Sequence, residues 1–201
     1  MRYGLSASVL FVCGALVLAA DWPRFRGPGG QGVSEEIGLP VEWSADKNIV
    51  WKVKLPGAGA SSPVTAGKRI FVTCYTGYGI DPKKPGNQKD LKRHLVCLDR
   101  VKGEVLWSKD FQPELPEHGY SGEGAYHGYA ASTPIVERDR LYVFFGKSGV
   151  YCFDLEGKEL WHESVGKNTN GWGSGASPII YKDFLIVNDP CVCSEHSILR
   201  R

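Results

Sequence analysis

The chain has 201 residues, and its 24 lysines and arginines against 22 aspartates and glutamates give a formal net charge of +2. This near-neutral balance excludes the strongly basic footprint of a nucleic-acid-binding domain. The 42% hydrophobic and 23% charged content is that of a globular protein rather than a disordered one. With 25 Gly, 12 Pro, six Trp and nine Tyr, the composition favours short strands joined by turns.

The first 20 residues have the pattern of a secretory signal peptide. Arg2 supplies the positive charge, residues 5–20 are uncharged and rich in Leu, Val and Ala, and small residues precede Asp21. The apolar stretch is short for a membrane span, which needs about 20 residues. We therefore expect an exported protein of the periplasm or cell envelope, without a transmembrane segment once residues 1–20 are removed. An extended N-terminal segment, residues 21–48, follows.

Residues 49–55 are predicted to form a half-buried strand. Trp51, Val53 and Leu55 alternate with Lys52 and Lys54, which is the period of two that a strand with one buried face requires. This strand opens the predicted β-rich region, which we place at residues 49–190.

An internal repeat organises this region. Each copy begins with Ser or Thr before Pro, continues through apolar runs such as residues 141–145 and 150–153, turns at an Asp and a Gly, and ends at a Trp. From Pro134 to Pro178 is 44 residues, the size of a four-stranded propeller blade. The repeat residues are Pro63, Pro134 and Pro178, then Asp99 and Asp154, then Gly103 and Gly157, and finally Trp51, Trp107 and Trp161.

These repeat residues are interpreted as structural. Pro suits the first residue of a strand, where no ladder donor is needed, and Asp before Gly forms turns. Since the Trp residues recur with the repeat, we interpret them as packing between neighbouring sheets rather than as ligand platforms. The fold class is therefore all-β, an incomplete β-propeller of four-stranded antiparallel blades with about two and a half blades present.

Five cysteines follow the signal peptide, and none is expected to bind metal. Cys97 and Cys152 occupy matching places in two repeats and read as small buried hydrophobes. Cys191 and Cys193 form a single Cys-x-Cys without a second half, which is a weak metal signal. A basic loop with interspersed aspartates is interpreted as solvated surface rather than a phosphate site; its basic residues are Lys83, Lys84, Lys89, Lys92 and Arg93.

An insert at residues 112–129 separates the first two repeats. Its glycines predict a flexible loop, and nothing fixes its His and Glu residues at the spacing of a zinc site. Loops on a rigid scaffold commonly carry function, so this insert is the predicted ligand-facing surface, with candidate residues His118, Tyr120, Glu123, Tyr126 and His127.

The tail, residues 191–201, carries no repeat residues and no alternation. We expect it to mark a truncation or a frameshift. An open propeller leaves unpaired strand edges, so this chain alone is expected to be marginally stable and prone to aggregate.

The repeats resemble those of PQQ-like β-propellers. The motifs that carry this likeness are Leu98-Asp99 to Gly103-Glu104 to Trp107, and Phe153-Asp154 to Gly157-Lys158 to Trp161. The segments 21–28, 127–134 and 172–178 are similar to those of one exported bacterial group. The resemblance implies a propeller of seven or eight blades, and two kinds of function occur on it: the outer-membrane assembly propeller, which is BamB-like, and the quinoprotein dehydrogenases.

The dehydrogenases of this family hold pyrroloquinoline quinone with a vicinal disulfide and Ca²⁺ with Glu, Asn and Asp. This sequence has no adjacent cysteines and no recognisable set of calcium ligands. We therefore predict a non-catalytic scaffold or binding module with protein partners in the cell envelope, no catalytic residue and no cofactor. One alternative is a fragment of a quinoprotein alcohol or sugar dehydrogenase that binds pyrroloquinoline quinone with Ca²⁺. A second alternative is a carbohydrate-binding propeller that uses the aromatic loops at residues 75–78 and 120–129.

Overall fold

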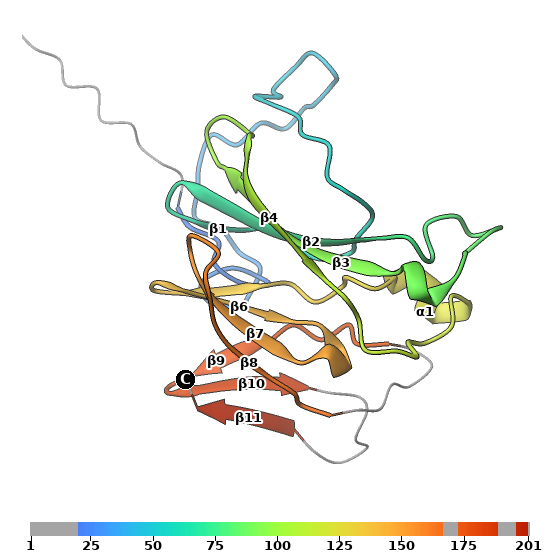
Figure 1. Ribbon diagram of the computed structural model, residues 1–201. Helices are drawn as coiled ribbons and strands as arrows, with labels where there is room; N and C mark the ends of the chain where they lie inside the picture. The colour runs from blue at the N-terminus through green and yellow to red at the C-terminus, as the bar shows by residue number, and fades with distance from the viewer. Residues whose placement is uncertain (1–19, 167–172, 189–195, 201) are drawn as a thin grey trace, which may run out of the picture.

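The computed structural model describes residues 20–166, 173–188 and 196–200. The predicted signal peptide up to residue 19 and the pair Cys191 and Cys193 lie outside these ranges. The described residues form eleven strands in three antiparallel sheets, with little helix (Figure 1). The all-β prediction and the incomplete propeller are confirmed.

The first two sheets are four-stranded meanders with the same strand order. The first runs β1-β2-β3-β4 and the second β5-β6-β7-β8, so chain neighbours are also sheet neighbours. The bounds are β1 Val64–Ala66, β2 Arg69–Thr76, β3 Lys92–Asp99, β4 Val105–Phe111, β5 Ile135–Glu137, β6 Arg140–Phe144, β7 Val150–Asp154 and β8 Glu159–Glu163.

The third sheet has three strands, β9 (Ile179–Tyr181), β10 (Phe184–Asn188) and β11 (His196–Arg200), in the order β11-β10-β9. β11 lies in the tail where no strand was predicted, and it pairs antiparallel with all five residues of β10. The ladder uses backbone amides and carbonyls, which every residue except Pro supplies. Pairing is therefore possible there without the repeat pattern.

Three of the strands predicted from the sequence can be compared with the structure: two apolar runs and one alternating segment. The runs at 141–145 and 150–153 are confirmed as β6 and β7. The strand predicted at residues 49–55 is wrong as a paired strand: the alternation is present, with Trp51, Val53 and Leu55 half-buried and Lys52 and Lys54 exposed, but the segment is not assigned to a strand. A β-strand is defined by its ladder, and none of the described strands pairs with this segment.

The sheets pack face to face through apolar clusters. Between the first and second sheets, Phe71, Leu95 and Cys97 meet Leu141 and Phe153, all fully buried. Between the second and third, Phe144 and Cys152 meet Leu185 and Val187. The thiols of Cys97 and Cys152 are free and buried, and burial raises the pKa of Cys97 to about 12, so both behave as small apolar residues.

The outer face of the first sheet is covered by the chain before it. Val72, Cys74, Val96 and Leu98 form a buried cluster, against which Trp51, Val53 and Leu55 pack. The segment 49–55 therefore occupies the position of a neighbouring blade although it lacks a ladder.

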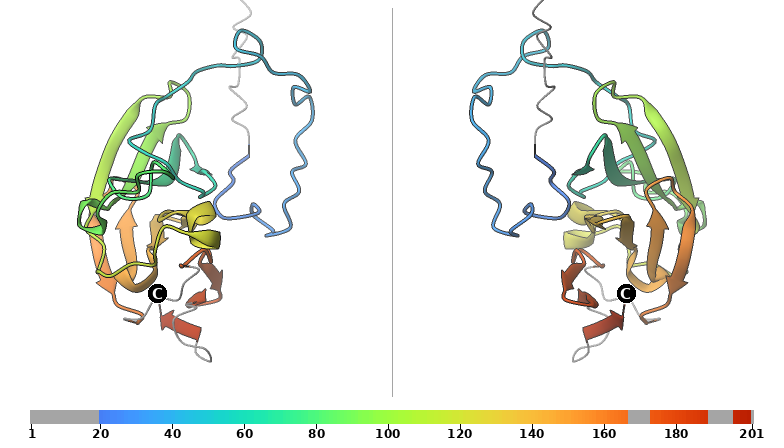
Figure 2. Two further views of the ribbon diagram at one scale, coloured as in Figure 1. Left: turned by 90° about the vertical axis from the view of Figure 1, so that its right-hand side faces the viewer. Right: turned by 90° about the vertical axis from the view of Figure 1, so that its left-hand side faces the viewer.

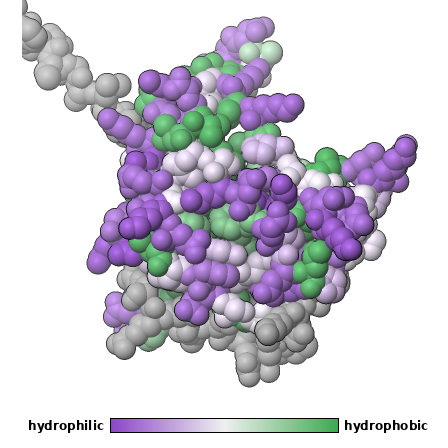
Figure 3. Space-filling view, viewed as in Figure 1, coloured by the Kyte–Doolittle hydropathy of each residue, from purple (hydrophilic) through white to green (hydrophobic). Residues whose placement is uncertain are grey.

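The N-terminal segment forms a wide loop that leaves the sheets and returns to them (Figure 2). Its start is fixed by backbone hydrogen bonds: Thr65 N donates to Trp22 O over 2.9 Å, and Val136 N donates to Pro23 O over 2.8 Å. The loop itself carries exposed apolar side chains, including Ile37 (95% exposed) and Val41 (90%). Hydrophobic patches also lie among polar ones over the upper part of the face in Figure 3, near this segment and β4.

The insert is more ordered than predicted. It contains a short helix, α1 (Gly122–His127), which ends at Gly128 with a positive φ of 60°. Two 3₁₀ turns, η1 (Gln88–Asp90) and η2 (Gly146–Ser148), flank the same region. Across the described residues, no helix has the length and apolar character needed to cross a bilayer.

Candidate functional site

The first strand of each sheet, β1, β5 or β9, is preceded by a Ser or Thr, and these three residues are linked by hydrogen bonds. Ser62 N donates to Thr133 Oγ1, and Thr133 N donates to Ser177 Oγ, each over 3.0 Å. The residue at the same repeat position thus bonds to its counterpart in the next repeat. Pro63, Pro134 and Pro178 follow, and each is succeeded directly by the first residue of β1, β5 or β9.

A cavity of about 450 Å³ lies between these strand starts and the N-terminal segment, within the size range of ligand sites. Thr133 and Ser177 line it from the strand starts, and Arg24, Arg26 and His127 supply its ionisable groups. Arg24 Nη2 donates to Pro28 O over 2.6 Å, and Arg26 has a left-handed φ of 61°. We call this cavity the central pocket.

The insert is bound to the first two sheets by a buried cation. Arg93, on β3, is only 4% exposed; its Nη2 donates to Glu117 Oε1 over 2.6 Å, its Nε to Tyr129 O over 2.7 Å and its Nη1 to Ser148 Oγ over 3.1 Å. The prediction that Arg93 lies in a solvated basic loop is wrong. It lies on β3, where residues 93–98 are all buried, and its charge is paired with Glu117.

His118 lies next to this ion pair in the interior. Its side chain is 2% exposed, it stacks on the Tyr129 ring at 4.5 Å, and its Nδ1 has no hydrogen-bond partner among the described residues. Burial lowers the pKa of His118 below its usual value, against the opposing effect of the Glu117 carboxylate. The imidazole is therefore neutral at neutral pH, and its 3.9 Å approach to Glu117 Oε2 is not an ion pair there.

The remaining candidates of the insert divide between the interior and the surface. Tyr120 is half-buried, whereas Tyr126 and His127 are exposed, and only His127 lines the central pocket. Glu123 belongs to α1, and its side chain lies outside the described part of the structure. Of these surface candidates, His127 is therefore the one placed to face a ligand in the central pocket.

The aromatic loops proposed for sugar stacking pack on one another instead. Tyr75, Tyr78 and Tyr129 are each at most 8% exposed and form a cluster with ring centroids 5.3–5.4 Å apart, to which Tyr120 is added. Stacking a sugar requires a free ring face, which these three side chains do not offer.

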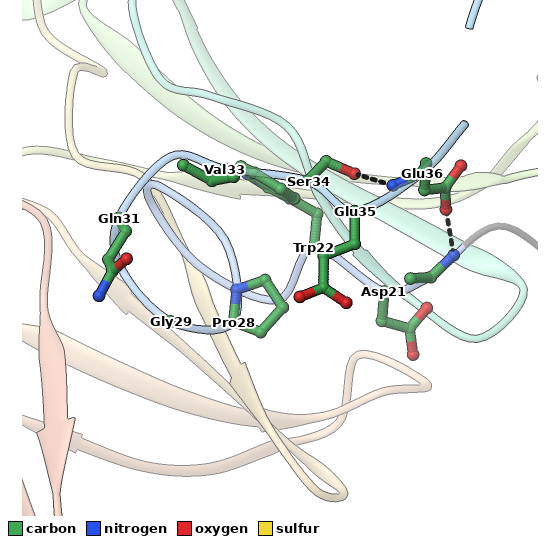
Figure 4. Close-up of a pocket in the computed structure, with 10 residues that line it drawn as sticks. Asp21, Trp22, Pro28, Gly29, Gln31, Val33, Ser34, Glu35 and Glu36 are labelled. Carbon is green, nitrogen blue, oxygen red and sulfur yellow. Dashed lines mark hydrogen bonds between the residues drawn. The ribbon is translucent and has the colours of Figure 1, made fainter. Parts of the chain in front are cut away.

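A second cavity, of about 580 Å³, lies within the N-terminal segment (Figure 4). Asp21, Glu35 and Glu36 give it an acidic lining, and Trp22 supplies apolar surface. Both carboxylate oxygens of Asp21 already accept from Gly67 N, at 2.9 and 3.0 Å, and Arg100 Nη1 donates to one of them. Because residues 20–36 line it alone, this cavity is separate from the strand starts.

Trp51 and Trp107 each lie over the turn between the third and fourth strands of the following sheet. Trp107 Nε1 donates to Leu155 O over 3.3 Å, and a Cβ on Gly157 would meet its indole at 3.0 Å. In that turn, Asp154 Oδ1 accepts from Lys158 N over 2.7 Å. Trp161 is half-buried against the second and third sheets.

The equivalent turn of the first sheet is built on Asp99. Its Oδ1 accepts from Val101 N and Lys102 N, each over 2.8 Å, and the backbone hydrogen bond from Lys102 is the main cause that lowers the pKa of this carboxyl. The carboxylates of Asp99 and Asp154 are thus occupied by their own turns.

Comparison with known families gives a decisive match. The family described as outer membrane protein assembly factor BamB matches residues 33–169 and, in a second alignment, residues 88–195. The chain belongs to this family. No curated protein sequence matches the chain.

Solved structures similar to this member of the BamB family include proteins of both functional kinds. BamB from Moraxella catarrhalis is 12% identical with a TM-score of 0.42, covering 69% of this chain and 33% of its own. Quinohemoprotein alcohol dehydrogenase from Comamonas testosteroni is 15% identical with a TM-score of 0.42, covering 65% and 17%. A europium-containing methanol dehydrogenase is 16% identical with a TM-score of 0.38, covering 62% and 19%. The chain therefore spans at most a third of these structures.

The lining of the central pocket in this BamB-family chain does not fit a Ca²⁺ ion. It holds two arginines and no carboxylate, whereas Ca²⁺ takes several oxygen ligands, among them carboxylates. Nowhere in residues 20–166, 173–188 and 196–200 do three His, Cys, Asp or Glu side chains gather as a metal site. That the protein holds no cofactor stays a prediction.

Two residues of the pocket were missed as ligand candidates. Arg24 and Arg26 stand in the segment 21–28, which carried part of the family resemblance, and nothing in their spacing marks them as neighbours of His127. They meet it because Thr65 and Val136 bind the backbone at Trp22 and Pro23, a long-range contact. The recurring Ser/Thr-Pro starts were the available signal for where the pocket lies.

Proposed function

We propose that this chain is part of an exported, non-catalytic propeller that binds a protein partner in the cell envelope through its central pocket. The pocket contributes hydroxyl groups from successive repeats and two cationic side chains, Arg24 and Arg26, with His127 beside them. The observation that carries the proposal is that the pocket beside the starts of β5 and β9 is lined by two arginines and by no acidic residue. Arg side chains bind carboxylates with bidentate geometry, so the partner segment is acidic and extended.

The membership in the BamB family supports this role, since the family is described by outer-membrane protein assembly. The buried Arg93–Glu117 pair and the packed tyrosines keep the insert fixed beside the pocket. A rigid site loses little conformational entropy when it binds an extended segment. Export to the periplasm or cell envelope belongs to the same proposal.

The proposal is tested with a fluorescein-labelled peptide of alternating Glu and Ser and the purified protein. We expect Arg24→Ala with Arg26→Ala to weaken the binding measured by fluorescence anisotropy by at least about tenfold, and added salt to weaken wild-type binding because the contacts are electrostatic. Lys83→Ala with Lys84→Ala is the matched control: it removes the same charge from an exposed loop, and binding should change less than about twofold.

Equal weakening by both double variants would contradict a specific site. The enzyme alternative has a separate readout, which is reduction of an artificial dye by alcohols or sugars after addition of pyrroloquinoline quinone and Ca²⁺. Dye reduction by the full protein would overturn the non-catalytic role even if the peptide binds.

A further inference from the structure

Two buried polar atoms lie without a protein partner between the insert and the second sheet. They are Nδ1 of His118 and Oγ of Ser132, and among the described residues no other buried side-chain nitrogen or oxygen lacks a hydrogen bond. His118 is 6% exposed and Ser132 is 3% exposed. Because an unpaired buried polar group destabilises a fold, these two atoms require a partner that the described side chains do not supply.

Both residues line the same small cavity. Arg93 of β3 lines it from the first sheet, Phe144 and Phe145 line it from the end of β6, and Ser174 lines it from the segment before the third sheet. Its volume is about 10 Å³, close to the roughly 10–15 Å³ that one buried water molecule needs. The cavity therefore has room for a single water and for nothing larger.

The hydrogen bond on the other side of the imidazole fixes what Nδ1 requires. His118 Nε2 lies 3.4 Å from Gly124 O, and since a carbonyl only accepts, Nε2 carries the ring proton. The buried ring is neutral, so Nδ1 is an acceptor without a proton of its own. The hydroxyl of Ser132 carries a proton that it can donate. Water satisfies both atoms, because it donates to one and accepts from the other.

The charges around the cavity disfavour an ion. Arg93 lines the cavity, and its guanidinium repels a cation. An anion meets no unmatched charge there, because Arg93 Nη2 is paired with Glu117 Oε1 at 2.6 Å. The other two guanidinium nitrogens donate to Tyr129 O and Ser148 Oγ. The cavity therefore selects a neutral molecule that both donates and accepts hydrogen bonds.

We propose that this cavity binds one water molecule, which donates to His118 Nδ1 and accepts from Ser132 Oγ. The water connects the insert to the residue directly before Thr133, which lines the central pocket. Ser132 is itself held from the first sheet, since Thr73 Oγ1 donates to Ser132 O over 3.2 Å. The water thus ties the insert to the start of the second repeat, independently of what the central pocket binds.

A high-resolution crystal structure of the wild-type protein tests the site directly. We expect one density peak within hydrogen-bonding distance, roughly 2.7–3.2 Å, of both His118 Nδ1 and Ser132 Oγ. A direct bond between these two atoms, a bond from either of them to another protein group, or no peak in the cavity would overturn the proposal. This measurement needs no variant, so it does not depend on whether a substitution folds.

A double-mutant cycle in urea unfolding then tests the bridge in solution. His118→Phe keeps an aromatic ring against Tyr129 but removes Nδ1, and Ser132→Ala removes Oγ. Since one water serves both atoms, the double variant should raise the unfolding equilibrium constant by less than the product of the two single effects, with a shortfall of about threefold or more.

The matched control is His118→Phe with Ser61→Ala. Ser61 Oγ donates to Thr73 O over 3.0 Å, and Ser61 does not line this cavity. The two control effects should therefore multiply to within about twofold. Effects that multiply in both pairs, or that fall short equally in both, would overturn the bridge.

Discussion

Two junctions between neighbouring layers can be compared within this molecule: the one between the first and second sheets, and the one between segment 49–55 and the first sheet. Both place a Trp over an Asp-Gly turn with the same hydrogen bond. Only at the first junction is the Trp on a strand that is hydrogen-bonded to its neighbour, β4 to β3, and only there does a buried ion pair hold the insert. Docking of side chains between layers therefore does not require strand pairing, whereas a four-stranded sheet does.

The largest expected effect on the free energy of unfolding comes from breaking the ion pair between Arg93 and Glu117, which only the first junction has. Glu117→Gln leaves the buried Arg93 guanidinium without its counter-charge, so the free energy of unfolding should fall by about 3–5 kcal/mol. Glu156→Gln is the control, since it breaks an ion pair of the same 2.6 Å length with Arg69 that is solvent-exposed, and it should cost at most about 1 kcal/mol. Urea unfolding measures both, and similar losses would show that the insert does not lock the first junction.

The next effect compares the two tryptophans. Trp107→Ala removes packing against Phe71 and over Gly157 from a strand held by its ladder, so the site cannot collapse and the loss should be about 3 kcal/mol. Trp51→Ala should cost about half of that in the isolated chain, because segment 49–55 can shift to fill the gap. Equal losses in urea unfolding of a monomeric preparation would mean that the segment is as firmly held as β4.

The smallest effect is a pH dependence confined to the first junction. The pKa of His118 is lowered in the folded protein by burial, so the unfolded chain binds its proton more readily. The neutral imidazole's contribution is full above pH about 6.5 and is lost as the pH falls through the lower folded pKa. His118→Gln should reduce the loss of stability between pH 7.5 and pH 5, measured by thermal unfolding, and an unchanged pH profile would contradict this assignment.

The sequence predicted the features that depend on local pattern. The apolar runs of β6 and β7 and the Asp-Gly turns are set by neighbouring residues, and they were located correctly. Whether residues 49–55 find a ladder, the pairing of β11 and the burial of Arg93 all depend on which distant segment lies alongside, and alternation does not specify that. The site was predicted only at His127, because Arg24 and Arg26 reach the central pocket through contacts with Thr65 and Val136.

Amide hydrogen exchange at residues 49–55, compared with that at residues 105–111 of β4, tests the central claim that side-chain docking between layers does not require a ladder. We expect the amides of residues 49–55 to exchange rapidly, because no described strand pairs with them, while those of β4 that bond to β3 are protected. Protection of residues 49–55 equal to that of β4 would contradict the account.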